Sequence, residues 1–327
     1  MKIRGINIIL WLSFLAALVS CNETIEPFEN DGYAISFKNI AVDTKQTIDE
    51  IDDMSNGFSV WGSAKNKSND EYQNIFEGTP VTKRGTVWGY DDLKFWQPNS
   101  IYRFFAFAPI SHDCSFKSVD NSYNVSYSLP TEFNVSDASF TDFVVASQTE
   151  ETPDPIVNAP APVALSFSHP FVKVRLHIFK SDDNEADVMK VTNVKITGVK
   201  NSGTYSFYNS TGVAEWTGST SQDVSSNLDG TLGVADNENE WVKLEFYALP
   251  QYISTGQVSV TISYDYTEPG QALKKMTYVA PVPQTDIWQA NKIITYKAEL
   301  SQEHKIRFQT PGVDTWGEQG AGIIIIQ

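Results

Sequence analysis

The chain contains little cysteine, histidine and positive charge for its length. Its 327 residues include two cysteines, four histidines, and 24 lysines and arginines against 40 aspartates and glutamates. With only Cys21 and Cys114 available, disulfide bonds cannot form the framework of the fold, so stability must come from packed cores. The net charge of −16 disfavours binding to nucleic acid or to anionic lipid surfaces.

Motifs of common catalytic and metal sites are also missing. The histidines form neither an H-x-x-x-H nor an H-E-x-x-H pattern, so a zinc site is not supported. No G-x-S-x-G motif, Walker loop or G-x-G-x-x-G motif after a strand is found. The acidic clusters at 182–185 and 236–240 lack the spacing and glycine of an EF-hand, and we interpret them as solvated loops. We expect no enzymatic activity, no metal and no cofactor.

Long apolar runs are scarce, and the clearest one is near the N-terminus. Ile6 to Val19 follow Lys2 and Arg4, and this run is shorter than the roughly 20 apolar residues of a membrane span. It fits the hydrophobic region of a secretory signal. The sequence Leu18-Val19-Ser20-Cys21 resembles the bacterial lipobox. That resemblance implies a lipoprotein signal peptide over residues 1–20 and lipidation of Cys21, with palmitate among the acyl chains.

An acylated cysteine implies a protein that is attached to a membrane without crossing it. Each buried acyl CH₂ contributes about 0.8 kcal/mol, and stable anchoring requires more than one chain. Cleavage before Cys21 would remove Lys2 and Arg4 and make the chain two charges more negative. Lipidation of Cys21 would leave Cys114 without a partner for an internal disulfide. We expect a surface-exposed protein of the cell outer membrane.

Helical periodicity is scarce, and an alternation of period two dominates the chain. Apolar residues alternate with polar ones through 33–37, 172–178, 242–248, 258–266 and 294–300. Strands of this kind bury one face and expose the other, as in antiparallel sandwiches.

Aromatic residues are concentrated in the first half of the sequence. From Tyr102 to Ala108 both faces of the alternating pattern are apolar, which predicts a central strand or one that is covered on both sides. We interpret the aromatics as core residues, because large rings fit a pleated surface and bury much area. The alternative is that exposed rings stack on sugars. The aromatics concerned are Trp61, Trp88, Tyr90, Phe95, Trp96, Tyr102, Phe104 and Phe105.

Turn residues and prolines divide the chain. Asn201-Ser202-Gly203, Asp229-Gly230 and Pro269-Gly270 predict turns. Residues 151–162 are rich in proline, which cannot donate to a sheet ladder, so they predict an extended linker. The sequence thus predicts an all-β protein with a signal peptide (1–20), an N-terminal β-sandwich domain (21–150), the linker (151–162) and a C-terminal β-sandwich domain (163–327).

Seven short motifs occur in an order and at spacings that are informative together. They are Phe58-Ser59-Val60-Trp61-Gly62, Tyr102–Pro109, Asp142–Ala146, Leu165–His169, Lys173-Val174-Arg175, Leu249-Pro250-Gln251 and Val313–Trp316. In these motifs the chain resembles the fimbrillin (Mfa-like) family of Bacteroidetes, the subunits of type V pili. The resemblance covers nearly all of the chain after the signal peptide. It implies two tandem β-sandwich domains of transthyretin-like, Greek-key type, and export as a lipoprotein precursor.

The resemblance also implies a mode of assembly. In polymerising members a protease removes the first strand, and a strand from a neighbouring subunit fills the exposed groove. Carried over to this chain, Tyr33, Ile35 and Phe37 lie on the removable strand, and the cut falls at Lys45-Gln46. The family usually has an arginine at the cleavage site. Arg84 is therefore an alternative position for the cut. The terminal run Ile323, Ile324, Ile325 and Ile326 is the candidate donor strand, and its alternative role is that of a final buried strand.

Two functions remain open at this point. The leading hypothesis is a surface-anchored pilus or adhesion subunit of the fimbrium. Its partners would be other pilin subunits, in a homo- or hetero-polymer, and host or microbial surface glycans or proteins. The alternative is a surface glycan-binding lipoprotein of a polysaccharide-uptake system. Separable strands at 33–42 and 320–327 would favour assembly. A strand fixed in mid-sheet, with neighbours on both flanks, would favour a monomeric adhesin.

Overall fold

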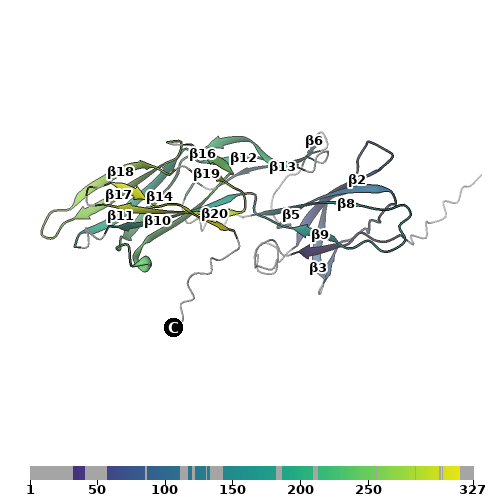
Figure 1. The fold of residues 1–327 in the computed structure, drawn as a ribbon, viewed down its shortest axis with the longest axis horizontal. Coiled ribbons are helices and arrows are strands. Elements are labelled where there is room, and N and C mark those ends of the chain that lie inside the picture. The colour runs from purple at the N-terminus through teal and green to yellow at the C-terminus, as the bar shows by residue number, and fades with distance from the viewer. Residues whose placement is uncertain are drawn as a thin grey trace, which may run out of the picture. The chain divides into compact units, whose positions relative to one another are not determined.

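The fold is all-β, as the sequence predicts (Figure 1). The computed structural model describes residues 32–40, 57–84, 87–110, 117–119, 122–129, 131–132, 143–181, 186–208, 213–254, 256–283, 285–301, 303 and 305–316. These residues form β-strands and a short 3₁₀ helix, η4 (Glu238–Glu240). None of the helices within these ranges is long and apolar enough to cross a membrane.

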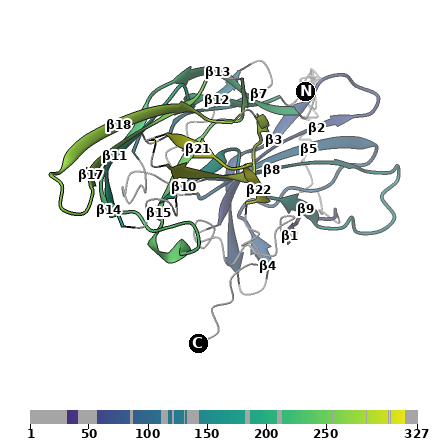
Figure 2. The same ribbon diagram turned by 60° about the vertical axis from the view of Figure 1, so that its left-hand side comes forward.

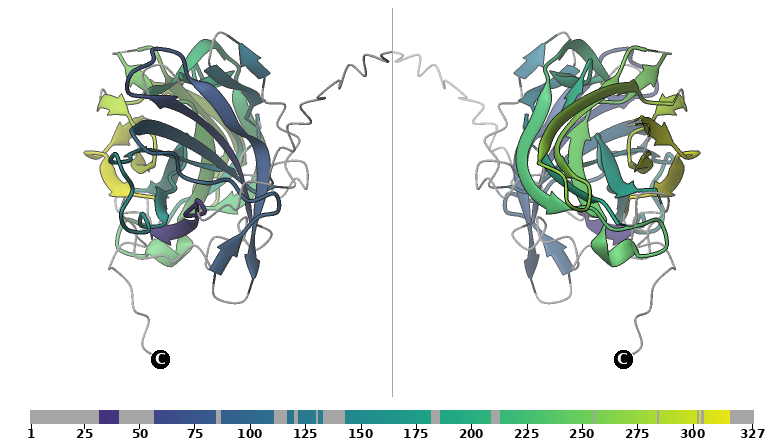
Figure 3. Two further views of the ribbon diagram at one scale, coloured as in Figure 1. Left: turned by 90° about the vertical axis from the view of Figure 1, so that its right-hand side faces the viewer. Right: turned by 90° about the vertical axis from the view of Figure 1, so that its left-hand side faces the viewer.

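The first sheet has seven strands in the order β8-β5-β2-β3-β4-β1-β9. The strands in that order are β8 (Val144–Glu151), β5 (Ser100–Ala108), β2 (Phe58–Asn66), β3 (Gln73–Arg84), β4 (Val87–Gly89), β1 (Phe37–Ile40) and β9 (Val163–Ser166). The two ends of this sheet meet, because the backbones of Val145 in β8 and Ser168 just after β9 exchange hydrogen bonds of 3.0 and 2.9 Å. The sheet therefore curves around one apolar interior (Figure 3).

Strand β5 is covered on both faces, which confirms the prediction from its two apolar faces. Tyr102 and Phe104 belong to the interior of the first sheet. Phe105 and Phe107 point to the other side, into a second cluster with Phe143 and other residues. All of these side chains are buried. The interpretation of the first-half aromatics as core residues is thus confirmed for Tyr90, Trp96, Tyr102, Phe104 and Phe105.

Two further sheets share the largest apolar core. One contains β15 (Val242–Ala248), β10 (Val172–Lys180), β20 (Lys292–Leu300), β21 (Ile306–Phe308) and β22 (Gly312–Thr315). The other contains β14 (Val224–Thr231), β11 (Val188–Thr197), β17 (Ser259–Thr267) and β18 (Lys274–Pro281). In β10, β15, β17 and β20 buried and more exposed residues alternate, as the period-two pattern predicts. Their buried side chains belong to one cluster. The two sheets lie next to each other in Figure 2.

The two remaining sheets join segments that are distant in the sequence. One contains β13 (Val213–Ser221), β12 (Lys200–Tyr208), β7 (Ser122–Ser128) and β6 (Lys117–Val119), and the other contains β16 (Gln251–Ile253) and β19 (Thr285–Trp288). Strand β7 pairs with β12, and β9 pairs with β1. The proline-rich stretch after β8 thus connects two strands of the first sheet. The division into two domains at 150 and 163 stays a prediction.

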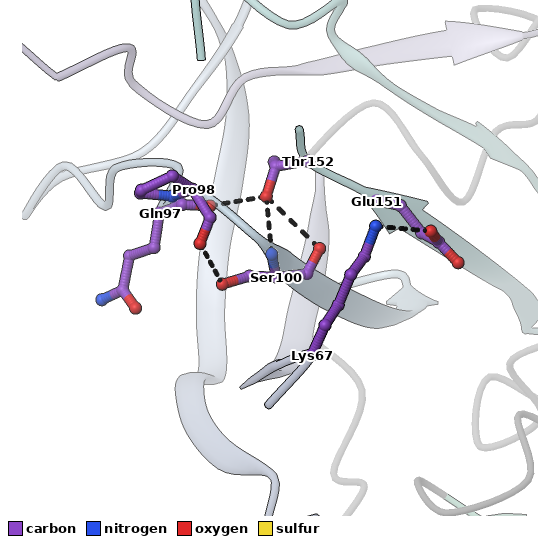
Figure 4. A network of polar contacts seen from close by, with 6 residues as sticks. All are labelled: Lys67, Gln97, Pro98, Ser100, Glu151 and Thr152. Atoms are coloured by element: carbon purple, nitrogen blue, oxygen red, sulfur yellow. Dashed lines mark hydrogen bonds and ion pairs between the residues drawn. The ribbon is translucent and has the colours of Figure 1, made fainter. Parts of the chain in front are cut away.

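A polar network fixes the start of the proline-rich stretch (Figure 4). The Thr152 hydroxyl accepts a hydrogen bond from the Ser100 amide at 3.0 Å and donates one to the Gln97 carbonyl at 2.6 Å. The Thr152 amide donates to the Ser100 carbonyl at 2.9 Å. Lys67 and Glu151 form an ion pair beside it at 2.8 Å. These bonds tie the end of β8 to the start of β5, and so set where the chain begins its path to β9.

Two predicted turns are wrong. Residues 201–203 lie within β12, and Asp229-Gly230 lies within β14. The glycines serve close packing there. A Cβ atom on Gly230 would lie 2.6 Å from Val242 Cγ2, and one on Gly203 would lie 3.1 Å from the Thr217 carbonyl oxygen. Pro269-Gly270 does form a turn, with a φ of 77° at Gly270.

Candidate functional site

The first strand lies in the interior of the seven-stranded sheet. Phe37, Lys38, Asn39 and Ile40 pair in parallel with residues 163–166 of β9. On its other side, β1 pairs antiparallel with β4 through Phe37 and Trp88. The segment is thus not a border strand, because both backbone edges of β1 have a neighbour. β1 thus occupies a slot between β4 and β9, and we refer to it as the first-strand slot.

Phe37 fills the centre of this slot. Its ring lies 5.6 Å from the ring of Phe76, 5.8 Å from those of Tyr90 and Phe104, and 6.3 Å from that of Phe58, measured between centroids. All four contacts are edge-on, the arrangement that aromatic quadrupoles favour. The side chain of Phe37 is 4% exposed. Without β1, the four rings would form the wall of an open apolar groove.

The segment before β1 is held by hydrogen bonds rather than by a regular ladder. The Ile35 amide donates to the Lys94 carbonyl at 2.8 Å, and the Trp96 amide donates to the Tyr33 carbonyl at 2.9 Å. The Tyr90 hydroxyl donates to the Ile35 carbonyl at 2.8 Å. Burial raises the pKa of Tyr90 above its ordinary value, against an opposing hydrogen bond with the Lys94 backbone, so the hydroxyl keeps its proton and can donate.

The three residues predicted for the removable strand are not equivalent. Ile35 and Phe37 are buried in the core of the first sheet, at 1% and 4% exposure. Tyr33, predicted on the same face, is 37% exposed, and the strand begins only at Phe37. The apolar anchor of the segment is therefore the pair Ile35 and Phe37, two residues apart on one face.

Several predicted site residues lie outside the part of the chain that the structure describes. They are Cys21, Lys45, Gln46 and the run from Ile323 to Ile326. Their assigned roles stay predictions. Arg84, the alternative cleavage site, ends β3 with an exposed side chain that donates a hydrogen bond to Asp91 at 2.8 Å.

The structure gives no support for a metal site among the described residues, where no group of three or more potential ligands comes together. In the described acidic loop at 236–240, Glu238 forms an ion pair with Lys297 at 3.3 Å. The other acidic loop, at 182–185, lies outside the described ranges.

Sequence reasoning missed the residues that line the slot. The sequence predicts Trp88 and Tyr90 as core aromatics, but not as neighbours of the first strand. Strand β9 begins at the start of the predicted C-terminal domain, and the sequence does not predict its pairing with β1, which makes it one wall of the slot. A local signal was present in Val163, Leu165 and Phe167, which alternate and are all buried in the first core. A parallel pairing across more than a hundred residues has no signature in a single sequence.

Comparisons with known proteins agree with this architecture. A family model described as fimbrillin-like matches residues 44–316. A fimbrial protein from Bacteroides vulgatus is 15% identical, with a TM-score of 0.61 over 87% of this chain and 99% of that one. A putative cell adhesion protein from Parabacteroides distasonis is 10% identical, with a TM-score of 0.55 over 88% of this chain and 97% of that one. No protein with a curated description matches.

At these identities the solved structures establish similarity of fold alone, whereas the family model covers most of the sequence. The match begins after the first strand and ends at Trp316, the last residue that the structure describes. It includes β4 and β9, the two strands that enclose the slot. The chain belongs to the fimbrillin-like family.

Proposed function

We propose that this protein is a fimbrial subunit that joins its neighbours by strand replacement at the first-strand slot. The family and the fimbrial and cell adhesion proteins of similar fold support a pilus subunit role at the cell surface, with other subunits as partners. The finer mechanism is our proposal. The observation that carries it is the seating of Phe37 among four aromatic rings, on a strand that shares one register pair with β4 in the part of the chain that the structure describes.

The slot defines what a replacing strand must supply. It needs a backbone that pairs with β9, and large apolar side chains two residues apart, as Ile35 and Phe37 are. Each buried side chain of this kind stabilises the complex by roughly 1.5–3 kcal/mol. The terminal isoleucines offer such a spacing at Ile323 and Ile325, or at Ile324 and Ile326. We assign the donor role to this run.

Proteolytic trimming would release the first strand. A cut at Lys45-Gln46 falls between β1, which ends at Ile40, and β2, which begins at Phe58, so no described strand is broken. After the cut, residues 33–40 would be held by non-covalent contacts alone, and the high effective concentration provided by the tether would be lost. A lysine at this position implies a protease that accepts lysine. Lipidation at Cys21 would anchor the precursor to the outer membrane.

The interior position of β1 is the observation that favours the competing function, a monomeric adhesin. A strand with neighbours on both flanks must break two sets of contacts before it leaves. Among the described residues the two flanks are unequal, however, since β1 shares four register pairs with β9 and one with β4. We therefore interpret the slot as closed in the intact chain and open after trimming.

Limited proteolysis of the full chain separates the two functions. A lysine-specific protease should cut first at Lys45, which mass spectrometry of the fragments would locate. The trimmed protein should then form ladders of strand-exchanged oligomers on a denaturing gel without boiling. The variant Lys45→Gln should stay intact and monomeric, and Arg84→Gln should behave like the parent. Complete trimming at Lys45 that leaves a stable monomer would establish the monomeric adhesin instead.

A second experiment concerns the anchor. Cells supplied with a labelled fatty acid should incorporate the label into the parent chain and not into Cys21→Ala. The variant should also appear in the soluble fraction. Equal labelling of Cys114→Ala and the parent is the matched control, and label that persists in Cys21→Ala would refute the assignment of the lipid site.

A further inference from the structure

A patch of positive charge lies on the polar face of the β15-β10-β20 sheet. Register pairing places Lys243, His177 and Lys297 side by side across the three strands. The neighbouring rung consists of Glu245, Arg175 and Thr295 in the same order. On a chain with a net charge of −16, two lysines on either side of a histidine in one rung concentrate positive charge locally.

A cavity opens over this patch. Its volume is about 460 Å³, and it is lined by Arg175, His177, Lys243, Leu244 and Glu245. Sites for small molecules in proteins usually measure about 300–1,000 Å³. The lining is mostly polar, because it belongs to the outward face of the sheet, whose opposite face packs into the large core. The cavity therefore suits a small polar ligand.

The charges around the cavity are only partly balanced. Glu245 accepts a hydrogen bond from Arg175 Nε at 2.8 Å and lies 3.5 Å from Lys173 Nζ. Lys297 lies 3.3 Å from Glu238. Lys243 forms no ion pair with any residue of the described ranges. A guanidinium has five N–H donors, and Glu245 engages the Nε of Arg175. Positive charge and hydrogen-bond donors thus remain available at the cavity.

His177 completes the donor set. Burial, together with Lys243, Arg175 and Lys297, lowers its pKa to about 4, with Glu238 opposing the shift. The imidazole is therefore neutral at pH 7, with one donor and one acceptor nitrogen. Its ring lies 6.1 Å from that of Trp241, which also carries Lys297 Nζ 4.9 Å above its face.

These features select a ligand with one negative group and several hydroxyl groups. Lys243 and Arg175 can hold a carboxylate, and Arg175 can do so with two parallel hydrogen bonds. Glu245 would repel a polyanion at short range, but it can accept hydrogen bonds from hydroxyl groups, as can neutral His177. From this combination we propose that the cavity binds a sugar acid, that is, a saccharide unit with a single carboxylate.

This site is separate from the first-strand slot. It is built from β10 and β15, whereas the slot is built from β1, β4 and β9. Ligand binding at this site does not require strand replacement. The sugar-acid site can therefore be tested independently of the proposed assembly. It would give a fimbrial subunit its own contact with acidic surface glycans.

The test follows the His177 imidazole by NMR in the full chain, with His177→Gln to assign the signal. D-glucuronic acid is added at constant ionic strength, and D-glucose, sodium sulfate and poly-glutamate are added in parallel. A carboxylate close to the ring should raise the pKa of His177 by about one unit or more. Lys243→Gln should weaken binding of D-glucuronic acid about tenfold. Lys275→Gln, which removes an exposed strand lysine elsewhere, should leave binding unchanged.

Each result of this titration either supports or overturns the proposed site. A shift with D-glucuronic acid that Lys243→Gln weakens and Lys275→Gln does not would support the site. No shift of His177, or an equal shift with D-glucose, would overturn it. An equal response to sulfate would overturn the sugar assignment and leave a simple anion site. Tighter binding of poly-glutamate would indicate an acidic protein partner and refute the sugar assignment.

Discussion

Phe37 lies directly opposite Trp88 in the antiparallel ladder between β1 and β4, and the described strands share no other register pair. The same Phe37 lies opposite Val163 in the parallel ladder with β9. One residue thus joins both walls of the slot, and its side chain fills the space between four rings. The contacts of β1 with its two neighbouring strands and with the aromatic core are therefore concentrated at Phe37.

The first prediction concerns this concentration. Phe37→Ala should lower the free energy of unfolding by about 3–5 kcal/mol, because it removes a buried ring and leaves a cavity. Urea titration followed by tryptophan fluorescence would measure the change. The neighbour Lys38 is exposed, so Lys38→Ala should change the free energy by less than about 0.5 kcal/mol. A similar, small effect for both variants would show that β1 is not held by its aromatic anchor.

A second prediction tests whether the first strand can be supplied from outside. A chain that begins at Gln46 should bind a peptide of residues 33–40, since the slot would keep both of its walls. Fluorescence polarisation of a labelled peptide would measure the affinity. The same peptide with Phe37→Ala should bind at least about tenfold more weakly, because a loss of about 1.4 kcal/mol already gives that factor. Equal binding of both peptides would argue against a specific slot.

Sequence predicts those features of this fold that depend on residues close together in the chain. The alternation from Val172 to Ile178 specifies β10 and its buried face, because side chains two residues apart must lie on one side of a strand. The doubly apolar run from Tyr102 to Ala108 likewise identifies a strand covered on both faces. Such patterns report burial within one segment, and the structure confirms them.

The pairing of distant segments could not be predicted in the same way. Nothing in residues 37–40 indicates that they lie beside residues 163–166 in parallel. Glycines that predict turns also occur within strands, where they allow close packing. The pair Asp229-Gly230 predicts a turn, whereas Gly230 leaves space for Val242 from another sheet. The slot is made of such non-local contacts, so the sequence indicated Ile35 and Phe37 but not the walls that receive them.

The third prediction concerns the hydrogen bond that closes over the segment before β1. Tyr90→Phe removes the donor to the Ile35 carbonyl and the acceptor of the Lys94 amide, at 2.8 and 3.3 Å. Leaving such groups without partners should cost about 1–3 kcal/mol. Urea titration would measure the loss, and amide hydrogen exchange should speed up at Ile35. Tyr33→Phe removes an exposed hydroxyl from the same region and should have little effect, whereas equal losses would contradict the assigned role of Tyr90.

The fourth prediction concerns the network at Thr152 (Figure 4). Thr152→Val keeps the shape of the side chain but removes the hydroxyl that bonds the Ser100 amide and the Gln97 carbonyl. The loss should be about 1–3 kcal/mol, because both backbone groups would lose a buried partner. Thr149→Val, at an exposed position of β8, is the matched control. If both variants were equally stable in urea, the network would not be what fixes the path from β8 to β9.

The fifth prediction is a dependence of stability on pH that originates at His177. Its pKa is lowered in the folded chain to about 4 from an ordinary 6.5, chiefly by burial and then by Lys243, Arg175 and Lys297. The unfolded chain therefore binds more protons between these values. The contribution of His177 is fully present above pH 6.5 and is lost as the pH falls towards 4. Unfolding free energies measured in urea across this range should fall less steeply for His177→Gln than for the parent. Parallel slopes would show that the imidazole titrates in the folded chain as it does in the unfolded one, and the partly unbalanced charges around the cavity would then be screened by solvent.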